Sequence, residues 1–402
     1  MMRVLYIHMI GAFGGASRSL AEAVHAVGPE LTARFVAPAG TAADHFGSLG
    51  EVVEARGISQ FDNTRYSHYR GLRWLVLARE IGYLPATVRA LLKARRCWPD
   101  IDLIHVNEFT GIVPWLIARR LFKVPVIVHV RSVANDDASL RTRFVSHLLR
   151  CKAEAVIAID ETVKESLPAD LDVEVIHNSF SQKPSAAATD LFANHTLRAS
   201  SFKVGFVGNL LRVKGIHELV EAARIVRDAG LDVEFIIVGG DAAPPKGLRA
   251  TIARLLGVAQ NSGEEVRETI VEQGLASLFH FTGATKDIAQ AYAKMDVLCF
   301  PSHFDAPGRP IFEAAFAGIP SIVAVRNPKP DTIVEGVTGL AIPPRDAEAL
   351  AAAITQLAGD RARARSMGEN ARGLAERNFD PAANAAKLVA VYRRVLGRAR
   401  SS

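Results

Sequence analysis

The most informative stretch of this 402-residue chain is residues 300–320, which read FPSHFDAPGRPIFEAAFAGIP. The pattern predicts the end of a buried strand, a loop rich in Gly and Pro, and then a short helix. Pro310 suits the first position of that helix, and Gly318 suits its C-terminal cap. We therefore expect unpaired backbone N–H groups at residues 308–311, where they would attract a phosphate or diphosphate.

Two charged side chains belong to this expectation. Glu313 falls in the first turn of the predicted helix, where its carboxylate can accept two hydrogen bonds from a vicinal diol such as ribose. The alternative is that Glu313 only complements the helix dipole. A second stretch, FVGNLLRVKG at 206–215, ends a strand at Gly208 and places Lys214 before a helix, where its ammonium can neutralise a diphosphate.

Short apolar runs alternate with helical patterns along the whole chain, which is typical of parallel sheets covered by helices on both faces. The strand, glycine turn and helix begin twice, near residues 2 and 202. We therefore expect an α/β fold with two doubly wound Rossmann-like domains facing a central cleft. The expected strands are residues 4–10, 101–106, 124–130, 155–159, 203–207, 233–238, 297–300 and 321–324, and helical windows are 17–27, 216–229, 289–294 and 347–358.

Composition sets the domain boundaries and the class of protein. We expect one domain at 1–182, a linker at 183–201 that is rich in Ser, Ala and Thr, and a second domain at 202–378. With 49% hydrophobic and 22% charged residues, the chain is neither disordered nor a disulfide scaffold. No apolar run is long enough to span a bilayer. The three cysteines form no CxxC pair and fit a reducing cytoplasm, where we expect the protein to reside.

Together these motifs resemble the retaining glycosyltransferases of family 4, the group 1 type with the GT-B fold. The C-terminal half carries the order G-x-L-x-x-x-K-G, V-G-G, F-x-G and P-S-x-x-[DE]-x-x-G-x-P-x-x-E. The N-terminal half is similar to the family in its glycine loop, its D-x-x-H-x-[HN] strand and its interdomain segment. These motifs lie at 208–215, 238–240, 281–283 and 301–320, and at 14–16, 102–107 and 175–178.

The resemblance implies a nucleotide-sugar donor, linked to UDP or GDP, held mainly by domain 202–378. Glu313 would bind the ribose, and Lys214 would bind the diphosphate. Asp305 occupies the first acidic position of the family's E-x7-E motif, which contacts the donor sugar, but it is one methylene shorter than the usual Glu. The implied donor-binding residues are Gly208, Asn209, Lys214, Gly239, Gly308, Arg309, Pro310, Ile311 and Glu313.

The same resemblance puts domain 1–182 on the acceptor side, with helix 379–402 returning to it. Gly14 and Gly15 would let the backbone approach the transferring group. Arg131 falls where the family's usual histidine sits, with His129 two residues earlier, and either could line the cleft. His105 is either a core-edge histidine or a cleft group. The implied catalytic residues are Asp305, Arg131 and Lys214.

These residues predict transfer of a sugar to a glycan or lipid-linked acceptor with retention of configuration. Lys214, the helix start, and Arg309 or Arg131 could stabilise the departing phosphate, so we expect neither a metal nor a further cofactor. The D-x-D patterns at 100–102 and 170–172 are close to chance. Asn209 stands where an arginine is usual, and together with the shorter Asp305 it keeps open a catalytically weak nucleotide-sugar-binding protein. Among enzymes, the alternative is a nucleotide-sugar epimerase of the GT-B type.

The positive charge is concentrated in two stretches. Residues 56–96 hold nine Lys and Arg against two acids, with Trp74 and other apolar residues interleaved, and residues 361–402 hold ten against three. Such a surface suits an anionic membrane face, which would make the protein peripheral at the inner membrane face; an ordinary solvated helical face is the alternative. A returning C-terminal helix could bring both stretches to one side. No nucleic-acid-binding module is present, so we expect no nucleic acid partner.

Overall fold

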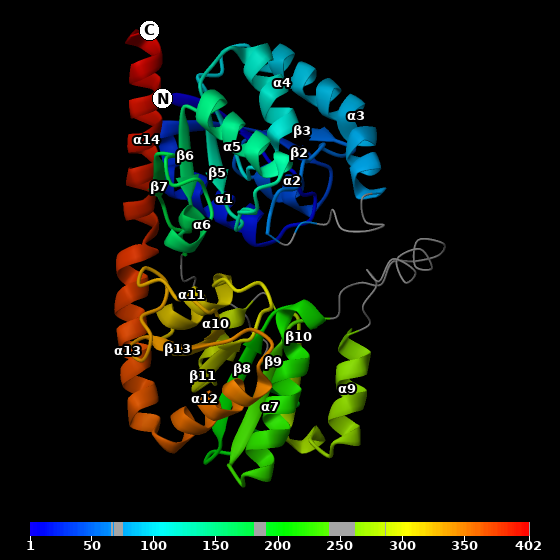
Figure 1. Cartoon of the computed structure of the whole chain (residues 1–402), viewed down its shortest axis with the longest axis vertical. Coiled ribbons are helices and arrows are strands. Elements are labelled where there is room, and N and C mark those ends of the chain that lie inside the picture. The colour runs from blue at the N-terminus through cyan, green and yellow to red at the C-terminus, as the bar shows by residue number, and fades with distance from the viewer. Residues whose placement is uncertain (66, 68–74, 181–189, 241–261, 286, 402) are drawn as a thin grey trace. The chain divides into compact units, whose positions relative to one another are not determined.

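The computed structural model describes residues 1–65, 67, 75–180, 190–240, 262–285 and 287–401 (Figure 1). The chain divides into two compact units. Unit 1 comprises residues 1–181 together with 379–402, and unit 2 comprises residues 182–378. The described part of the expected linker, 190–201, packs on unit 2, where Phe192 is buried against the sheet.

Unit 1 is built on a parallel sheet with the strand order β3-β2-β1-β4-β5-β6-β7. The order reverses between β1 and β4, which is the pattern of a doubly wound sheet with its ligand-binding edge at the carboxyl ends of these strands. The strands are β1 (Met2–Ile7), β2 (Leu31–Pro38), β3 (Glu51–Ala55), β4 (Leu103–Val106), β5 (Val126–Val130), β6 (Ala155–Ala158) and β7 (Val173–Val175).

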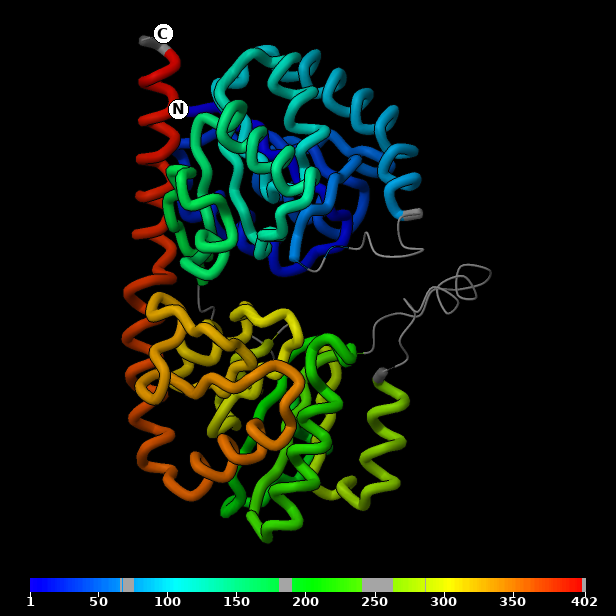
Figure 2. Tube along the Cα trace, in the orientation of Figure 1, coloured from blue at the N-terminus to red at the C-terminus, as the bar shows by residue number. Residues whose placement is uncertain are grey.

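The helices of unit 1 cover this sheet, and the last of them comes from the C-terminal end of the chain. Figure 2 shows this helix, in red at the C-terminal end of the trace, running along unit 1. Its Leu388 and Tyr392 are buried in one cluster with Leu20 and Val24 of the first helix. The helices are α1 (Gly15–Val27), α2 (Thr41–Phe46), α3 (Leu75–Cys97), α4 (Ile112–Phe122), α5 (Leu140–Lys152), α6 (Glu161–Glu165) and α14 (Pro381–Ser401).

Unit 2 repeats the architecture with the strand order β10-β9-β8-β11-β12-β13, reversing between β8 and β11. Its strands are β8 (Phe202–Val207), β9 (Val233–Val238), β10 (Phe279–Gly283), β11 (Val297–Phe300), β12 (Ser321–Ala324) and β13 (Gly339–Ile342). Its helices are α7 (Ile216–Asp228), α9 (Ser262–Glu272), α10 (Ile288–Tyr292), α11 (Arg309–Phe316), α12 (Ala347–Gly359) and α13 (Arg361–Asn378).

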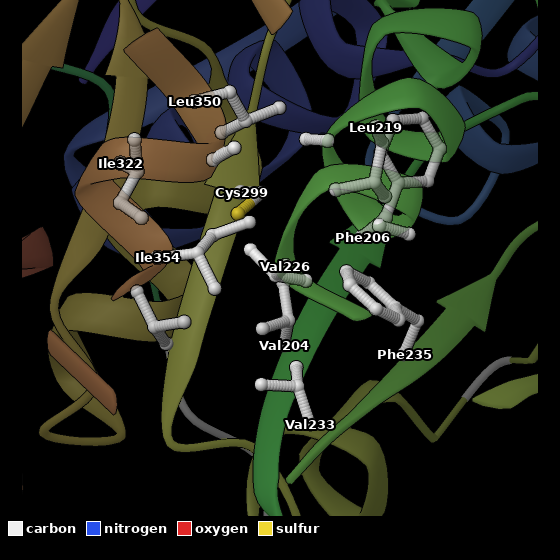
Figure 3. Packing of buried hydrophobic residues seen from close by; sticks show 14 of the residues in the cluster. Val204, Phe206, Leu219, Val226, Val233, Phe235, Cys299, Ile322, Leu350 and Ile354 are labelled. Atoms are coloured by element: carbon white, nitrogen blue, oxygen red, sulfur yellow. The ribbon is translucent and has the colours of Figure 1, made fainter. Parts of the chain in front are cut away.

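The core of unit 2 explains why its strands read as continuous apolar runs. Val204 and Cys299, from the two central strands, are fully buried against Leu219 of α7 and Ile354 of α12 (Figure 3). Helices also cover the other sheet face, where Ile236 and Leu298 are buried. A strand covered on both faces is apolar at nearly every position.

The prediction of two doubly wound α/β sheets is confirmed, and a strand is present at each of the eight expected places. The first strand is shorter than expected because it ends at Ile7, and His8 already belongs to the loop that follows. Five strands had no expectation. They are β2, β3, β7, β10 and β13.

Helices α3 and α14, which carry the two basic stretches within unit 1, do not form one surface. Residues 361–378 form α13 in unit 2, whereas α14 belongs to unit 1. Within unit 1, α14 and α3 lie on opposite sides (Figure 1). Arg70, Arg73 and Trp74, counted in the 56–96 stretch, lie outside the described residues. Among the described helices, none is long and apolar enough to cross a membrane.

Candidate functional site

The two loops that diverge at the switch point of unit 2 follow β8 and β11, and they pack against each other. The His303 backbone N–H donates to Val213 O at 3.0 Å. Gly215 has a φ of +78°, and a Cβ there would lie 1.9 Å from Pro301 O, so both its conformation and its surroundings require glycine. The fold therefore brings together the two stretches that the sequence singled out.

Lys214 is placed by these loops over two aromatic rings. Its Nζ lies 5.1 Å from the centroid of the Phe304 ring and 5.9 Å from that of Phe300. Burial lowers the pKa of Lys214. Within the described residues, no carboxylate forms an ion pair with it. Its charge is thus supported by ring faces but not neutralised, as expected for a group that receives an anion.

The loop after β11 also makes a side-chain contact with α7 that the sequence reasoning missed. His303 Nε2 lies 2.7 Å from Glu218 Oε1 in the first turn of α7. The second carboxylate oxygen of Glu218 is buried and has no partner in the described part of the chain. His303 stands inside the quoted 300–320 stretch, but nothing in the sequence indicated that Glu218 would face it.

The glycines after β8 and β9 pack backbone to backbone. Gly239 has a φ of +149°, and a Cβ there would lie 1.9 Å from Gly208 O. The N–H of Leu210 donates to Gly240 O at 3.2 Å. Asn209, between these contacts, is exposed, and its side chain has no partner among the described residues. The close approach leaves Asn209 at the tip of the loop.

The start of α11 differs in detail from the expectation. Gly308 is the N-cap, and Arg309 and Pro310 occupy the first two helical positions. Gly308 also packs on the Phe300 ring, since a Cβ there would lie 2.4 Å from Phe300 Cζ. The expectation of an unpaired amide is wrong at Ile311, whose N–H donates to Gly308 O at 3.0 Å. The side chain of Ile311 is buried in the core.

Glu313 is the fifth helical residue of α11, one position further along the helix than expected. Its Oε1 accepts a hydrogen bond from Arg309 Nε at 2.7 Å, and its Oε2 accepts one from the Tyr292 hydroxyl at 3.1 Å. Tyr292 also donates toward Pro310 O at 3.2 Å. A tyrosine and an arginine therefore fix the direction of this carboxylate, and the sequence had named only the arginine.

Asp305 follows β11 in the left-handed region, with a φ of +51°. Its Oδ2 lies 2.7 Å from Arg326 Nη1, and its Oδ1 accepts the Arg326 backbone N–H at 2.8 Å. Arg326 was not predicted; its side chain is 67% exposed. The pair ties the loop after β11 to the loop after β12.

In unit 1, Gly14 is the N-cap of α1 and Gly15 is its first residue, at the end of the loop that follows β1. The Gly14 backbone N–H donates to Ser17 Oγ at 2.7 Å, and its φ of −141° suits any residue. Nothing described lies within 4 Å of a Cβ built on either glycine. Neither local conformation nor packing requires glycine here, so the open space is available to a ligand.

Arg131 follows β5 and donates to three neutral acceptors. They are Asn107 Oδ1 at 2.5 Å, Asn178 Oδ1 at 2.7 Å and His129 Nδ1 at 3.3 Å. Burial lowers the pKa of Arg131 to about 10, so the guanidinium stays charged at neutral pH. Asn107 and Asn178 are the last residues of two motifs quoted from the sequence, but their contacts with Arg131 were not foreseen.

Glu108 lies beside this arginine and was not predicted. Burial raises the pKa of Glu108 to about 7. Its carboxylate accepts hydrogen bonds from Ser132 Oγ at 2.7 Å, from the Phe109 N–H at 2.9 Å and from the Arg131 N–H at 3.4 Å. Its position directly after the D-x-x-H-x-[HN] motif was the available signal.

The two histidines assigned to the cleft lie inside unit 1. His105 is fully buried, and its Nδ1 lies 2.7 Å from the Tyr392 hydroxyl of α14. The His129 ring lies 5.3 Å from the His105 ring and contacts Arg131. Burial lowers the pKa of His105 to about 3 and also lowers that of His129. His105 is therefore the core-edge histidine of the two alternatives, and not a cleft group.

The D-x-D patterns have other partners. Asp100 and Asp102 both bind the Arg3 guanidinium, each at 2.7 Å, and Asp170 binds Arg150 at 2.6 Å. Across the described ranges, no group of three His, Cys, Asp or Glu side chains could hold a metal ion.

Comparison with known families accounts for both units. Residues 188–374 match the model described as glycosyl transferases group 1, and residues 14–178 match that of a glycosyl transferase 4-like domain. The chain belongs to the group 1 glycosyltransferases. In each unit of this glycosyltransferase, the sheet edge at the switch point carries basic groups and glycine turns. These two edges are the candidate functional sites.

Curated relatives of this glycosyltransferase act in different settings. The capsular polysaccharide biosynthesis glycosyltransferase CapM of Staphylococcus aureus is 27% identical over 187 residues, which is 46% of this chain and 44% of CapM. The D-inositol 3-phosphate glycosyltransferase of Corynebacterium aurimucosum is 25% identical over 397 residues, covering 90% of this chain and 88% of the relative.

Solved structures match the whole chain. Anabaena HepE in complex with UDP has a TM-score of 0.73 at 21% identity, covering 98% of this chain and 100% of HepE. Sucrose-phosphate synthase from Thermosynechococcus elongatus has a TM-score of 0.72 at 21% identity, covering 99% and 100%. These matches establish the GT-B fold.

Proposed function

We propose that the enzyme moves a sugar from a nucleoside diphosphate sugar to a glycan or lipid-linked acceptor, with retention of configuration and without a metal ion. One observation carries the proposal. At the switch point of unit 2, the un-neutralised ammonium of Lys214 lies beside the loop that leads into α11 and carries Asp305. A cation beside that loop suits a diphosphate, which is the leaving group of such a donor.

The donor contacts follow from this placement. Lys214 meets the diphosphate as a point charge, and Gly308 lets it approach the start of α11. Glu313 accepts hydrogen bonds from the ribose hydroxyls, which replace its hydrogen bond from Arg309. The Arg309 guanidinium then turns toward the diphosphate. Asp305 contacts the sugar, with Arg326 holding its direction. Uracil is the first nucleotide base to test, because HepE was solved with UDP and with UDP-glucose.

The reaction needs no covalent intermediate on the protein. As the bond from the anomeric carbon to the phosphate oxygen breaks, the acceptor oxygen bonds to the same face of the sugar. The acceptor's proton passes to the departing phosphate. Lys214 stabilises the charge that develops on the leaving group, and we assign the same task to Arg131 in unit 1. Gly14 and Gly15 leave room for the transferring group.

A screen of donors tests the proposal. Thermal stability of the protein is measured with UDP, GDP and ADP sugars, and transfer or hydrolysis of the stabilising donor is then followed with and without EDTA. We expect turnover that survives EDTA. Strict dependence on Mg²⁺ or Mn²⁺ would contradict metal independence. Release of an epimerised sugar without acceptor would favour the epimerase alternative, and tight binding without any turnover would favour the binding-protein alternative.

We also infer that the protein works in the cytoplasm at an anionic membrane face, through α3. Ile81, Leu84 and Leu92 on this helix are 61%, 37% and 38% exposed, and Arg89 and Lys93 beside them are exposed. Apolar side chains flanked by cations suit an anionic lipid surface. The free, exposed thiols of unit 1 support a reducing compartment.

Sedimentation with vesicles tests this surface. We expect binding to vesicles that contain phosphatidylglycerol and little binding to pure phosphatidylcholine. The double variant Ile81→Ser/Leu84→Ser should lose most of the binding. Val271→Ser is the matched control, since Val271 is 67% exposed on α9 of unit 2. Equal binding by both variants would rule out α3 as the docking helix.

A further inference from the structure

Asn107 stands where three parts of unit 1 meet at the carboxyl ends of its strands. It follows β4 directly and is 1% exposed. Its Oδ1 accepts the Arg131 Nε–H at 2.5 Å, and its Nδ2 lies 2.9 Å from His8 Nδ1 and 3.3 Å from Ala16 O. One amide thus contacts the loops after β1 and β5 and the first turn of α1.

The direction of this amide follows from proton positions. A guanidinium has only donors, so the oxygen of Asn107 must face Arg131 and its nitrogen must face His8 and Ala16. His8 Nδ1 then acts as an acceptor, which makes the ring neutral with its proton on Nε2. Burial and the charge of Arg131 lower the pKa of His8 to about 4, in keeping with a neutral ring at pH 7.

Ala16 is the second residue of α1 and follows the glycine pair directly. The contact from Asn107 therefore holds the start of α1 at the glycine turn. We propose that Asn107 is a positioning residue for sugar transfer, whose amide holds the guanidinium of Arg131 and the turn at Gly14 and Gly15 in one arrangement. This inference rests on the function proposed above.

Asn178 provides the matched comparison. It also accepts a hydrogen bond from the Arg131 guanidinium, at 2.7 Å, but its amide nitrogen donates no hydrogen bond to another described residue. Replacement of either asparagine by aspartate keeps an acceptor for Arg131 and adds the same charge beside it. Only at Asn107 does this change remove a donor that Ala16 O and His8 Nδ1 use. The difference in kcat between the two variants therefore measures what the Asn107 amide contributes by connecting Arg131 to the start of α1.

Steady-state kinetics of Asn107→Asp and Asn178→Asp test the inference. We expect kcat of Asn107→Asp to fall about tenfold or more below that of Asn178→Asp, a further loss of about 1.4 kcal/mol. The KM for the nucleotide sugar should differ by less than about threefold, because the donor contacts we propose lie in unit 2. Asn107→His, which offers one acceptor and one donor nitrogen, should recover much of the difference.

Equal kcat values for the two aspartate variants would overturn the proposal that Asn107 is a positioning residue. A second measurement uses the unaltered protein and does not depend on turnover or on the folding of a variant. Nitrogen NMR of the His8 ring should show the proton on Nε2 and an accepting Nδ1; a proton on Nδ1 would overturn the inference as well. Failure of the unaltered enzyme to transfer any sugar would instead count against the proposed function.

Discussion

The Tyr392 hydroxyl lies 2.7 Å from His105 Nδ1 and joins two residues that are 287 positions apart in the chain. Tyr392 belongs to α14, and His105 belongs to the central strand β4. The same hydroxyl lies 3.2 Å from the Tyr6 hydroxyl. Residues from three distant parts of the sequence thus form one buried polar cluster in unit 1.

Tyr392→Phe should destabilise unit 1. The change leaves His105 Nδ1 buried without its partner, which costs about 1–3 kcal/mol. Urea unfolding followed by tryptophan fluorescence measures the effect, because all three tryptophans lie in residues 1–181. Tyr6→Phe removes a hydroxyl from the same cluster but leaves the contact to His105 intact. Equal losses in the two variants would contradict this account.

Acid should destabilise unit 1 through its buried imidazoles. Burial lowers the pKa of His8 to about 4 and that of His105 to about 3, against about 6.5 in the unfolded chain. As the pH falls below 6.5, these histidines therefore bind protons in the unfolded state but not in the folded state, and the free energy of unfolding decreases. In His105→Gln, the slope of unfolding free energy against pH should decrease by about 1.4 kcal/mol per pH unit. His25→Gln, at an exposed position, is the control variant.

Glu108 should act in the opposite direction. Because burial raises its pKa to about 7, above the ordinary value, its contribution to stability is complete below pH 4.5 and is lost as the pH rises through 7. Glu108→Gln should therefore gain stability relative to the unaltered protein between pH 5 and pH 8, by at most about 3 kcal/mol. Unfolding curves at both pH values measure this gain. Glu54→Gln, at an exposed position, is the control variant.

Lys214→Gln should weaken nucleotide binding. The change removes the un-neutralised cation beside Phe304, and we expect the Kd for UDP to rise about tenfold or more. Calorimetric titration at two salt concentrations measures it, and the variant should also lose part of the salt dependence. Lys294→Gln is the control, because Lys294 is an exposed lysine of the same unit. Unchanged affinity in Lys214→Gln would remove this lysine from the diphosphate site.

Glu313→Ala should raise the Kd for a nucleoside diphosphate at least about tenfold, since it removes the proposed ribose acceptor. Tyr292→Phe keeps the carboxylate but removes one of the hydrogen bonds that direct it, so we expect a smaller rise of about threefold. Titration with UDP and with uracil separates the ribose contact from contacts to the base. If Glu313→Ala binds UDP normally, the carboxylate does not bind ribose and only complements the helix dipole.

Much of the fold could be predicted because the central strands are covered on both sides. Strands such as β9 and β12 are mostly apolar, with Glu234 and Ser321 as the exceptions, and their bounds were predicted to the residue. The strands that end each sheet are β3, β7, β10 and β13. All four escaped prediction, since an outer strand has one uncovered edge and carries charged or small residues, as the sequence EVVEA of β3 does.

The site was predictable only where one loop contains the whole feature. Gly308, Arg309 and Glu313 lie within one short stretch, and the structure joins two of them directly. Arg326 and Tyr292 come from other elements, and their contacts with Asp305 and Glu313 depend on how the strands are ordered. No local pattern encodes such a contact. The paired amide at Ile311 was missed for a different reason, because it depends on where the helix begins.

The return of α14 to unit 1 also sets an order of events during synthesis. Unit 2 occupies residues 182–378, so its entire sequence has been synthesised before Tyr392 is added to the chain. Unit 1 therefore cannot complete its core until α14 has been synthesised, and the sheet face that α14 covers stays exposed to solvent. Unit 2 can fold before then. Domains generally fold as units during translation. Here we expect the second unit to finish first, and the first unit to remain a client for chaperones until the last helix arrives.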